Sequence, residues 1–118
     1  MKPLHFFILV ISIIAFWESP VILASEYRIE EFAVTSISGW EDYAAVSGNI
    51  VVWEDWRNGN WDIYGYNLDT STEFPICTAS KEQAYPEISD HIIVWRETRN
   101  GNLDIYGYDL DTTTEIAV

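Results

Sequence analysis

The stretch that decides the fold reads Val51-Val52-Trp53-Glu54-Asp55-Trp56-Arg57-Asn58-Gly59-Asn60-Trp61-Asp62-Ile63-Tyr64-Gly65-Tyr66. Forty-two residues later it returns as Ile93-Val94-Trp95-Arg96-Glu97-Thr98-Arg99-Asn100-Gly101-Asn102-Leu103-Asp104-Ile105-Tyr106-Gly107-Tyr108. Each copy joins a β-branched apolar run to a second strand through an Asn-Gly pair, which is typical of a β-hairpin. Residues 43–76 and 85–118 are identical at 19 of 34 positions. A fixed period of this length indicates a repeat architecture.

Each copy contains four short strand-like segments, so the sequence predicts two four-stranded antiparallel sheets, at residues 43–78 and 85–118. The expected strands are 43–47, 50–53, 61–68 and 73–78, then 85–89, 92–95, 103–110 and 114–118. Asn58-Gly59 predicts a type I′ turn, because both residues tolerate positive φ. Gly65 lies inside a strand, which indicates that a ring or another backbone approaches closely there.

Residues 28–35 are predicted to form one further strand, because Glu31-Phe32 lies 42 residues before Glu73-Phe74. It would be the outer strand of a preceding repeat. Four strands in roughly 42 residues, joined by tight turns, is the plan of a β-propeller blade. The expected fold is therefore all-β over residues 28–118. It consists of two propeller blades and an extra N-terminal outer strand, as a partial propeller or one that oligomerisation completes.

The segments Asp55-Trp56-Arg57-Asn58-Gly59-Asn60-Trp61-Asp62-Ile63-Tyr64 and Arg99-Asn100-Gly101-Asn102-Leu103-Asp104-Ile105-Tyr106 resemble the TolB-like, WD40-like propeller repeat with its D-R-x-G-x-x-D-I-Y core. The wider stretch, from Val51 to Tyr66, is similar to repeats of large archaeal and bacterial cell-surface propeller proteins. The second copy departs from the first in having Glu97, Thr98 and Leu103. The resemblance implies a propeller fold, and that fold hosts many unrelated functions.

Residues 1–25 read as a secretory signal peptide, with Lys2 before a short apolar run and small residues after it. An uncleaved N-terminal anchor is the alternative, and it would be the only contact with a membrane. Lys2 and Glu18 are the only charged residues in this segment, so the remainder keeps the net charge of −13. That charge opposes binding to nucleic acid. We expect the protein to be secreted or exposed at the cell surface.

The motif residues that recur are read as structural. They are Trp53, Arg57, Asn58, Gly59, Asp62 and Tyr64 in the first copy, and Trp95, Arg99, Asn100, Gly101, Asp104 and Tyr106 in the second. We expect Arg57 to pair with Asp55 or Asp62, and Arg99 with Glu97 or Asp104. Partly exposed pairs of this kind contribute about 0.2–1 kcal/mol each. A calcium loop around Gly59 is the alternative, but its spacing does not match the twelve-residue calcium motif.

Three tryptophans lack an aromatic counterpart in the other copy and are the candidate ligand contacts: Trp40, Trp56 and Trp61. Rings beside amides and carboxylates are what sugar sites use, and a small oligomeric lectin is one functional hypothesis. The recurring tryptophans and tyrosines are interpreted as packing between blades. Cys77, the only cysteine, is interpreted as a small buried hydrophobe.

No pattern of nucleophile, base and metal ligands supports catalysis, so no enzyme activity, metal or cofactor is predicted. The favoured hypothesis is an exported propeller module or fragment that acts in binding or assembly at the cell surface. The expected partners are other copies, joined head to tail, or further propeller repeats, with a cell-surface protein or glycan as another possibility. A truncated part of a TolB-type envelope scaffold or of a propeller-bearing peptidase is the remaining alternative.

Overall fold

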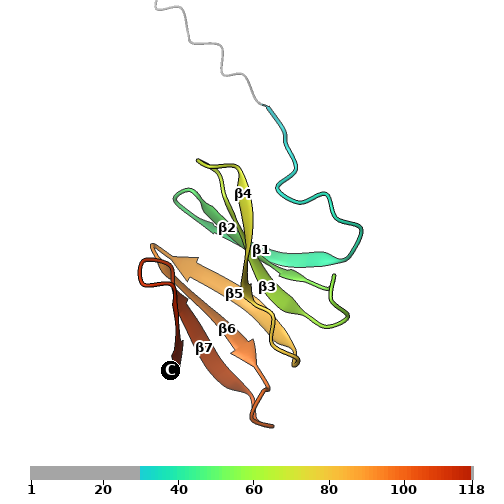
Figure 1. Cartoon of the computed structure of the whole chain (residues 1–118), viewed down its shortest axis with the longest axis vertical. Coiled ribbons are helices and arrows are strands. Elements are labelled where there is room, and N and C mark those ends of the chain that lie inside the picture. Colours follow the sequence, from blue (N-terminus) through green and yellow to red (C-terminus); the bar gives the residue numbers. More distant parts are fainter. Residues whose placement is uncertain (1–29, 118) are drawn as a thin grey trace, which may run out of the picture. The chain divides into compact units, whose positions relative to one another are not determined.

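The computed structural model describes residues 30–117, and within that range all regular structure is β (Figure 1). The predicted signal segment, residues 1–25, lies outside the described range. No helix among the described residues is long and apolar enough to cross a membrane. The strands are β1 (Glu41–Ser47), β2 (Ile50–Asp55), β3 (Asp62–Asn67), β4 (Thr72–Cys77), β5 (Gln83–Ser89), β6 (Ile92–Glu97), β7 (Asp104–Asp109) and β8 (Thr114–Ala117).

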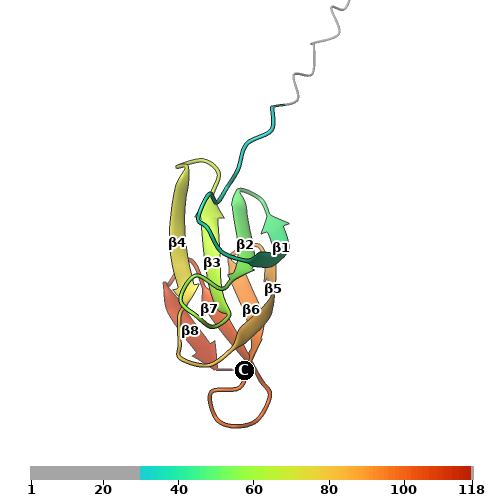
Figure 2. The ribbon, with the colours of Figure 1, turned by 90° about the vertical axis from the view of Figure 1, so that its right-hand side faces the viewer.

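The eight strands form two antiparallel sheets in sequence order, β1-β2-β3-β4 and β5-β6-β7-β8 (Figure 2). We call them blade 1 and blade 2. Their registers repeat: Trp53 pairs with Tyr64 in blade 1, and Trp95 pairs with Tyr106 in blade 2. Each inner strand, β1 and β5, carries an irregularity at the same place. The predicted all-β fold with two four-stranded sheets is confirmed.

The two blades pack face to face around one apolar core. Its buried members are Val52, Ile63 and Cys77 from blade 1, and Ile93, Trp95 and Tyr106 from blade 2. Because side chains alternate along a strand, each blade has two faces. We call one face the forward face; in blade 1 it carries Val52 and Ile63. We call the other the rear face; in blade 2 it carries Trp95 and Tyr106. The forward face of blade 1 therefore covers the rear face of blade 2.

The turn between the two middle strands differs from the predicted type I′ hairpin. Gly59 and Gly101 have φ of +87° and +83°, whereas Asn58 and Asn100 are absent from the residues with positive φ. The Gly59 N–H donates to the Trp56 carbonyl at 3.0 Å and closes a four-residue turn. The side chain of Asn58 is held by the following strand instead, because its amide donates to the hydroxyl of Tyr64 at 3.0 Å.

The predicted strand at 28–35 is wrong in its described part, because residues 30–40 form no strand. An outer strand depends on hydrogen bonds to the third strand of its own sheet, as β4 depends on β3. Among the described residues no third strand of a preceding blade lies beside this segment. It instead leads into β1, and the Trp40 carbonyl accepts a hydrogen bond from the Trp56 N–H at 3.0 Å.

The close approach predicted at Gly65 is present. A Cβ at this position would lie 2.8 Å from the ring of Phe74, on β4, and 3.0 Å from Ile76. At Gly107 in blade 2 the nearest atom would be a backbone oxygen at 3.4 Å. The difference arises because Ile116 takes the place of Phe74 opposite Gly107.

Gly65→Ala is expected to lower the free energy of unfolding by about 1–3 kcal/mol, the usual cost of overpacking, because the Phe74 ring must shift. Gly107→Ala should cost less than about 1 kcal/mol and is the matched control. Urea unfolding of both variants measures this. Phe74→Ile should absorb most of the Gly65→Ala loss in the double variant; equal losses at the two glycines would contradict the steric explanation.

Candidate functional site

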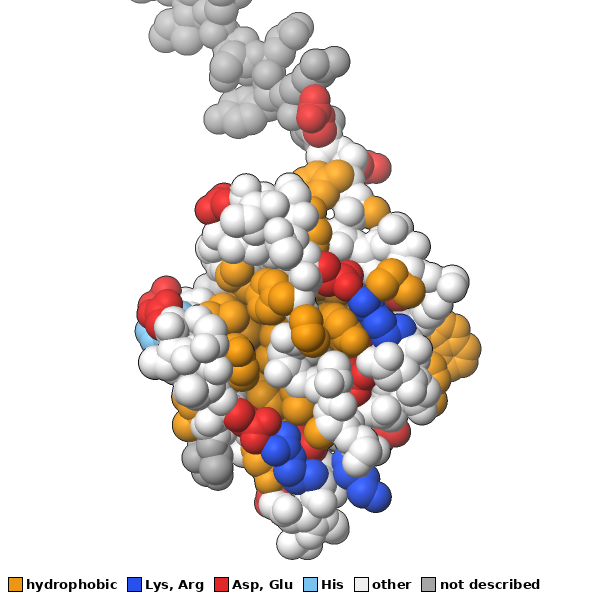
Figure 3. All heavy atoms as spheres, viewed as in Figure 1, with side chains coloured by type: hydrophobic (Ala, Val, Ile, Leu, Met, Phe, Trp, Pro, Cys, Tyr) orange, Lys and Arg blue, Asp and Glu red, His pale blue; other side chains and the backbone are white. Residues whose placement is uncertain are grey.

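The forward faces of the two blades have equivalent residues but different exposure. Ile63 is 0% exposed under blade 2, whereas its counterpart Ile105 is 47% exposed. Leu103 and Ile116, in the same blade as Ile105, are 60% and 37% exposed. A separate group of hydrophobic side chains lies in the middle of Figure 3, where β4 is drawn in Figure 1, with cationic side chains beside acidic ones around it. The forward face of blade 2 is thus an apolar surface that no described residue covers.

One carboxylate reaches across the contact between the blades, from β2 to β5. Glu54, on the forward face of blade 1, is 4% exposed. Its Oε1 accepts a hydrogen bond of 2.7 Å from the backbone N–H of Tyr85, which has a positive φ of 56° at the β5 irregularity. Burial raises the pKa of Glu54, and this hydrogen bond partly offsets the effect. The same N–H position in blade 1 belongs to Tyr43, and there Asp42 of the same strand accepts the bond at 2.8 Å.

A buried carboxylate–arginine cluster stands on the rear face of each blade. In blade 2, Glu97 is 0% exposed and accepts hydrogen bonds from Trp95 Nε1 at 3.0 Å and from Arg99 Nε at 2.7 Å. Arg99 also pairs with Glu115 at 2.6 Å, and its guanidinium lies 3.9 Å from the Tyr106 ring centroid. This cluster faces blade 1.

Blade 1 meets that cluster through Cys77. Its Sγ lies 3.6 Å from an Arg99 nitrogen and 4.0 Å from a Glu97 oxygen. Burial raises the pKa of the Cys77 thiol to about 11, so the thiol stays neutral at physiological pH. The cysteine acts here as a small packing residue at the junction of the blades.

Blade 1 repeats the cluster on its own rear face. Asp55 is 0% exposed and accepts from Trp53 Nε1 at 3.0 Å, from Arg57 Nε at 2.8 Å and from the Arg57 N–H at 2.9 Å. Arg57 also pairs with Glu73 at 2.6 Å and lies over the Tyr64 ring. Burial acts to raise the pKa of Asp55, but the bonds from Arg57 and Trp53 outweigh it and leave that pKa lowered.

The predicted ion pairs are confirmed, and one detail needs correction. Arg57 and Arg99 bind Asp55 and Glu97, and each has a further partner that was not predicted, Glu73 and Glu115 on the outer strands. The sequence missed these partners because they lie 16 residues away, on a strand two positions across. The carboxylates are also fully buried, so a surface value of under 1 kcal/mol does not apply to them.

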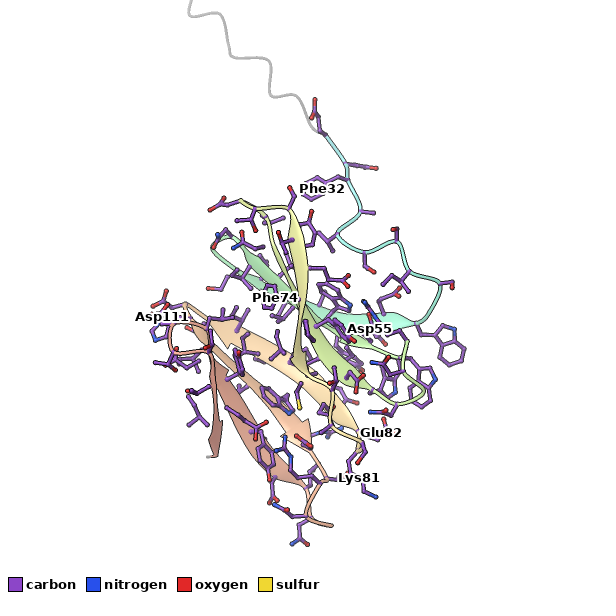
Figure 4. All side chains as sticks on the ribbon, viewed as in Figure 1. Phe32, Asp55, Phe74, Lys81, Glu82 and Asp111 are labelled. Carbon is purple, nitrogen blue, oxygen red and sulfur yellow. The ribbon has the colours of Figure 1, made fainter. Side chains whose placement is uncertain are left out.

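The polar residues around Gly59 hold the loop together. Asp62 is 0% exposed and accepts from the side-chain amides of Asn58 at 2.6 Å and Asn60 at 2.8 Å. Asn60 also donates to the carbonyls of Ala79 and Lys81, both at 3.1 Å, and so ties the loop to the segment joining the blades; Figure 4 labels Lys81 on this segment. Donors already occupy these carboxylates, so the contacts favour the structural interpretation over a calcium loop.

The three candidate tryptophans lie in one part of blade 1. Trp56 and Trp61 pack edge to face with ring centroids 5.2 Å apart. Trp40 is joined to Trp56 through its backbone, and its side chain is 73% exposed. Trp61 is further held by the segment joining the blades, since its carbonyl accepts from Gln83 N–H at 2.8 Å. The structure therefore brings all three together, but two of the rings are engaged with each other.

A group that the sequence did not single out lies at the opposite end of the blades, at the turns of blade 2. Ligand atoms of His91, Asp109 and Asp111 lie within 4.8 Å of one another, and this set could hold a divalent cation (Figure 4 labels Asp111). In blade 1 the equivalent place is filled by Asn49, whose amide donates to Asp69 at 2.8 Å. His91 therefore bridges in blade 2 the two turns that correspond to those bridged by Asn49 in blade 1. The sequence did not indicate this group because His91 lies far from the two aspartates along the chain.

The rear face of blade 1 holds a pocket of about 300 Å³. Its lining includes Thr35, Asp42, Tyr43, Val51 and Trp53. Forty-two residues on, the counterparts of Val51 and Trp53 are Ile93 and Trp95, which pack against Val52 and Ile63 in the core between the blades. The pocket thus lies between residues 34–35 and the rear face of blade 1, beside the counterparts of two core residues.

No family model and no curated protein matches the chain. Solved structures match it. TolB from Agrobacterium tumefaciens superposes with a TM-score of 0.59 and 18% identity, over 72% of this chain and 32% of that chain. TolB from Acinetobacter baumannii gives 0.57 and 21%, over 71% of this chain and 22% of that chain. The chain thus spans a third or less of these relatives, and the likeness shows a TolB-like propeller fold, as the repeat motif predicted.

Arg57→Ala is expected to lower the free energy of unfolding by about 3–5 kcal/mol, because it leaves the buried Asp55 carboxylate without its cation. The lowered pKa of Asp55 means that its contribution is present above the unfolded-state pKa and is lost as pH falls through the folded-state value. Arg57→Ala should therefore also move acid unfolding to higher pH. Arg57→Lys, which keeps the charge without the planar fork, should lose less. A loss below 1 kcal/mol would show that Asp55 is solvated.

His91 is expected to make the stability of blade 2 depend on pH near neutrality. The hydrogen bond to Asp90 raises the pKa of His91, and the carboxylates of Asp111 and Asp109 add to the effect. A raised pKa gives a contribution that is full below the unfolded-state pKa and is lost as pH rises through the folded-state value. His91→Asn, which copies Asn49, should remove this dependence. Urea unfolding of both proteins between about pH 5 and pH 8 tests it, and parallel curves would contradict it.

Proposed function

We propose that the protein is an exported β-propeller module for binding and assembly, whose partner packs on the exposed forward face of blade 2. The observation that carries this is the contrast between equivalent residues. Ile63 is 0% exposed beneath a neighbouring blade, and Ile105 is 47% exposed at the same position of the next blade. Contiguous apolar patches mark interaction sites on soluble proteins. A partner shaped like a propeller blade fits the forward face of blade 2.

The partner that fits best is a second copy of the chain. The forward face of blade 2 repeats the forward face of blade 1, which already packs on a rear face within the chain. The rear face of blade 1 is the counterpart of that covered face; its Trp53 is only 2% exposed, and the pocket beside it, lined also by Thr35, is where we expect a second copy to dock. Two complementary, different faces on one molecule give head-to-tail contacts, which close into a ring when the rotation allows.

Export is proposed on the pattern of residues 1–25, with its basic start and short apolar run. A secreted or cell-surface location suits a module that binds through exposed faces. A small lectin is a less favoured function: Trp40 offers an exposed ring, but the rings of Trp56 and Trp61 are engaged with each other. The buried carboxylates of the two clusters accept hydrogen bonds from tryptophan and arginine side chains, which favours a structural role for them over a catalytic one. A part of a TolB-type scaffold or of a propeller-bearing peptidase is the remaining, less favoured function.

The assembly proposal predicts that the chain sediments as an oligomer at micromolar concentration, and that Ile105→Asn weakens association. An amide buried in an apolar contact costs at least about 1.4 kcal/mol, so the dissociation constant should rise tenfold or more. Thr112→Asn, at the exposed β7–β8 turn, is the control and should change nothing. Sedimentation velocity measures this, with circular dichroism to show that the fold is kept. A compact wild-type monomer would overturn the proposal.

A further inference from the structure

We propose that the side chains of His91, Asp109 and Asp111 in blade 2 form a binding site for one divalent transition-metal ion of the Zn²⁺ type. His91 lies in the β5–β6 turn, Asp109 ends β7, and Asp111 lies in the β7–β8 turn. Their ligand atoms lie within 4.8 Å of one another. The site belongs to one chain, so it is independent of the proposed assembly.

The two repeats differ at this place in the direction of metal ligands. The blade 1 counterparts of the three residues lie 42 positions earlier and are Asn49, Asn67 and Asp69. Blade 1 therefore has two amides and one carboxylate where blade 2 has an imidazole and two carboxylates. Imidazole nitrogens and carboxylate oxygens bind divalent metals, whereas the nitrogen of a side-chain amide is only a hydrogen-bond donor.

The fold of the β7–β8 turn does not require a carboxylate at Asp109. Its Oδ1 accepts hydrogen bonds from the N–H groups of Asp111 at 2.9 Å and Thr112 at 3.3 Å. Oδ1 of Asn67 accepts the same two bonds in blade 1, at 2.9 and 3.1 Å. The two residues therefore differ in their second atom. It is an amide nitrogen in Asn67 and, in Asp109, a carboxylate oxygen that is left for a ligand.

The imidazole of His91 is not needed to join the two turns either. A backbone bond joins them in both blades, from Leu110 N–H to the His91 carbonyl at 2.9 Å and from Leu68 N–H to the Asn49 carbonyl at 2.8 Å. The Asn49 amide then donates directly to the aspartate of the other turn at 2.8 Å. His91 Nδ1 lies 3.8 Å from Asp111 Oδ2, too far for a hydrogen bond. Two ligands of a tetrahedral zinc ion lie about 3.4 Å apart, so an ion fits where the direct bond is missing.

The surroundings of the site are acidic and open to solvent. Asp90 adds a further carboxylate, with Oδ2 3.0 Å from His91 Nδ1, and its counterpart in blade 1 is Gly48. His91 and Asp111 also line a groove of about 370 Å³. The described residues that line this groove include no Lys or Arg to balance the three carboxylates. A bound cation would supply that balance.

The mixed ligand set indicates which class of ion binds. Ca²⁺ and Mg²⁺ take oxygen ligands, whereas Zn²⁺ binds histidine nitrogen and carboxylate oxygen at similar distances. Three side-chain ligands leave a position for water, which the open groove can supply. The ion would join the β5–β6 turn to the β7–β8 turn and so stabilise blade 2 when it binds.

Isothermal titration calorimetry of the full chain with Zn²⁺, at about pH 8 so that the imidazole can bind a metal, tests the site. Wild type should bind one Zn²⁺ per chain. Asp109→Asn copies blade 1 and should weaken binding at least about tenfold, because it removes a charged ligand. His91→Asn/Asp109→Asn should abolish binding. Asp69→Asn removes the same charge from the counterpart turn of blade 1 and should bind like wild type. Circular dichroism shows that each variant keeps the fold.

The reverse exchange tests whether these residues are sufficient. Asn49→His/Asn67→Asp gives blade 1 the same three side chains and should raise the stoichiometry to two Zn²⁺ per chain. Ca²⁺ should bind wild type more weakly than Zn²⁺ does. The proposal is wrong if wild type shows no saturable Zn²⁺ binding, if His91→Asn/Asp109→Asn binds Zn²⁺ as wild type does, if Ca²⁺ binds as tightly as Zn²⁺, or if the exchange in blade 1 adds no site. None of these results bears on assembly, which sedimentation measures separately.

Discussion

A propeller blade must have both of its faces covered, and the rest of this structure depends on that constraint. The middle strands, β2 and β6, are apolar on both sides, so a single four-stranded sheet cannot bury them. One contact between two blades covers one forward face and one rear face. The core between the blades accordingly takes Val52 and Ile63 from one side and Trp95 and Tyr106 from the other. Of the remaining two faces, the forward face of blade 2 leaves Ile105 47% exposed, whereas the rear face of blade 1 leaves Trp53 only 2% exposed.

One carboxylate is fully buried on the rear face of each blade, Asp55 in blade 1 and Glu97 in blade 2. Asp55 and Glu97 would be costly there as isolated carboxylates, since removing an ion from water takes several kcal/mol. Each is bound by the indole N–H of a tryptophan two residues earlier and by an arginine two residues later. The arginine then lies on a tyrosine ring of the next strand and reaches the outer strand. One cluster thereby links three strands and fixes their register, which explains why its residue types recur.

The sequence was sufficient for the architecture and insufficient for the contacts. The period of 42 residues, the apolar runs and the Asn-Gly pairs predicted two four-stranded sheets, because these signals are local. Gly65 correctly indicated a close ring, since strands rarely tolerate glycine without a reason. Glu73 as a partner of Arg57 could not be found in this way, because the pairing of outer strands is set by register across the sheet.

Two local predictions were wrong for the same physical reason: the type I′ turn at Asn58-Gly59 and the outer strand at residues 28–35. Asn58-Gly59 carries the residue types of a type I′ turn, but the side chain of Asn58 binds the next strand and takes the backbone out of positive φ. Residues 30–35 carry the pattern of an outer strand but have no third strand of their own sheet beside them. In both cases the local propensity was read correctly, and a tertiary contact, present or missing, decided the outcome.

The differences between the two repeats are as informative as their identities. Residues that hold a blade together, such as Trp53 and Trp95 or Arg57 and Arg99, are the same in both copies. The charge reversal from Glu54 to Arg96 falls instead on a side chain that points out of the blade toward its neighbour. Such a change leaves the blade itself intact and alters only what can pack against it. Among the positions at which the two repeats differ, this is one where a contact between blades can be made different from another.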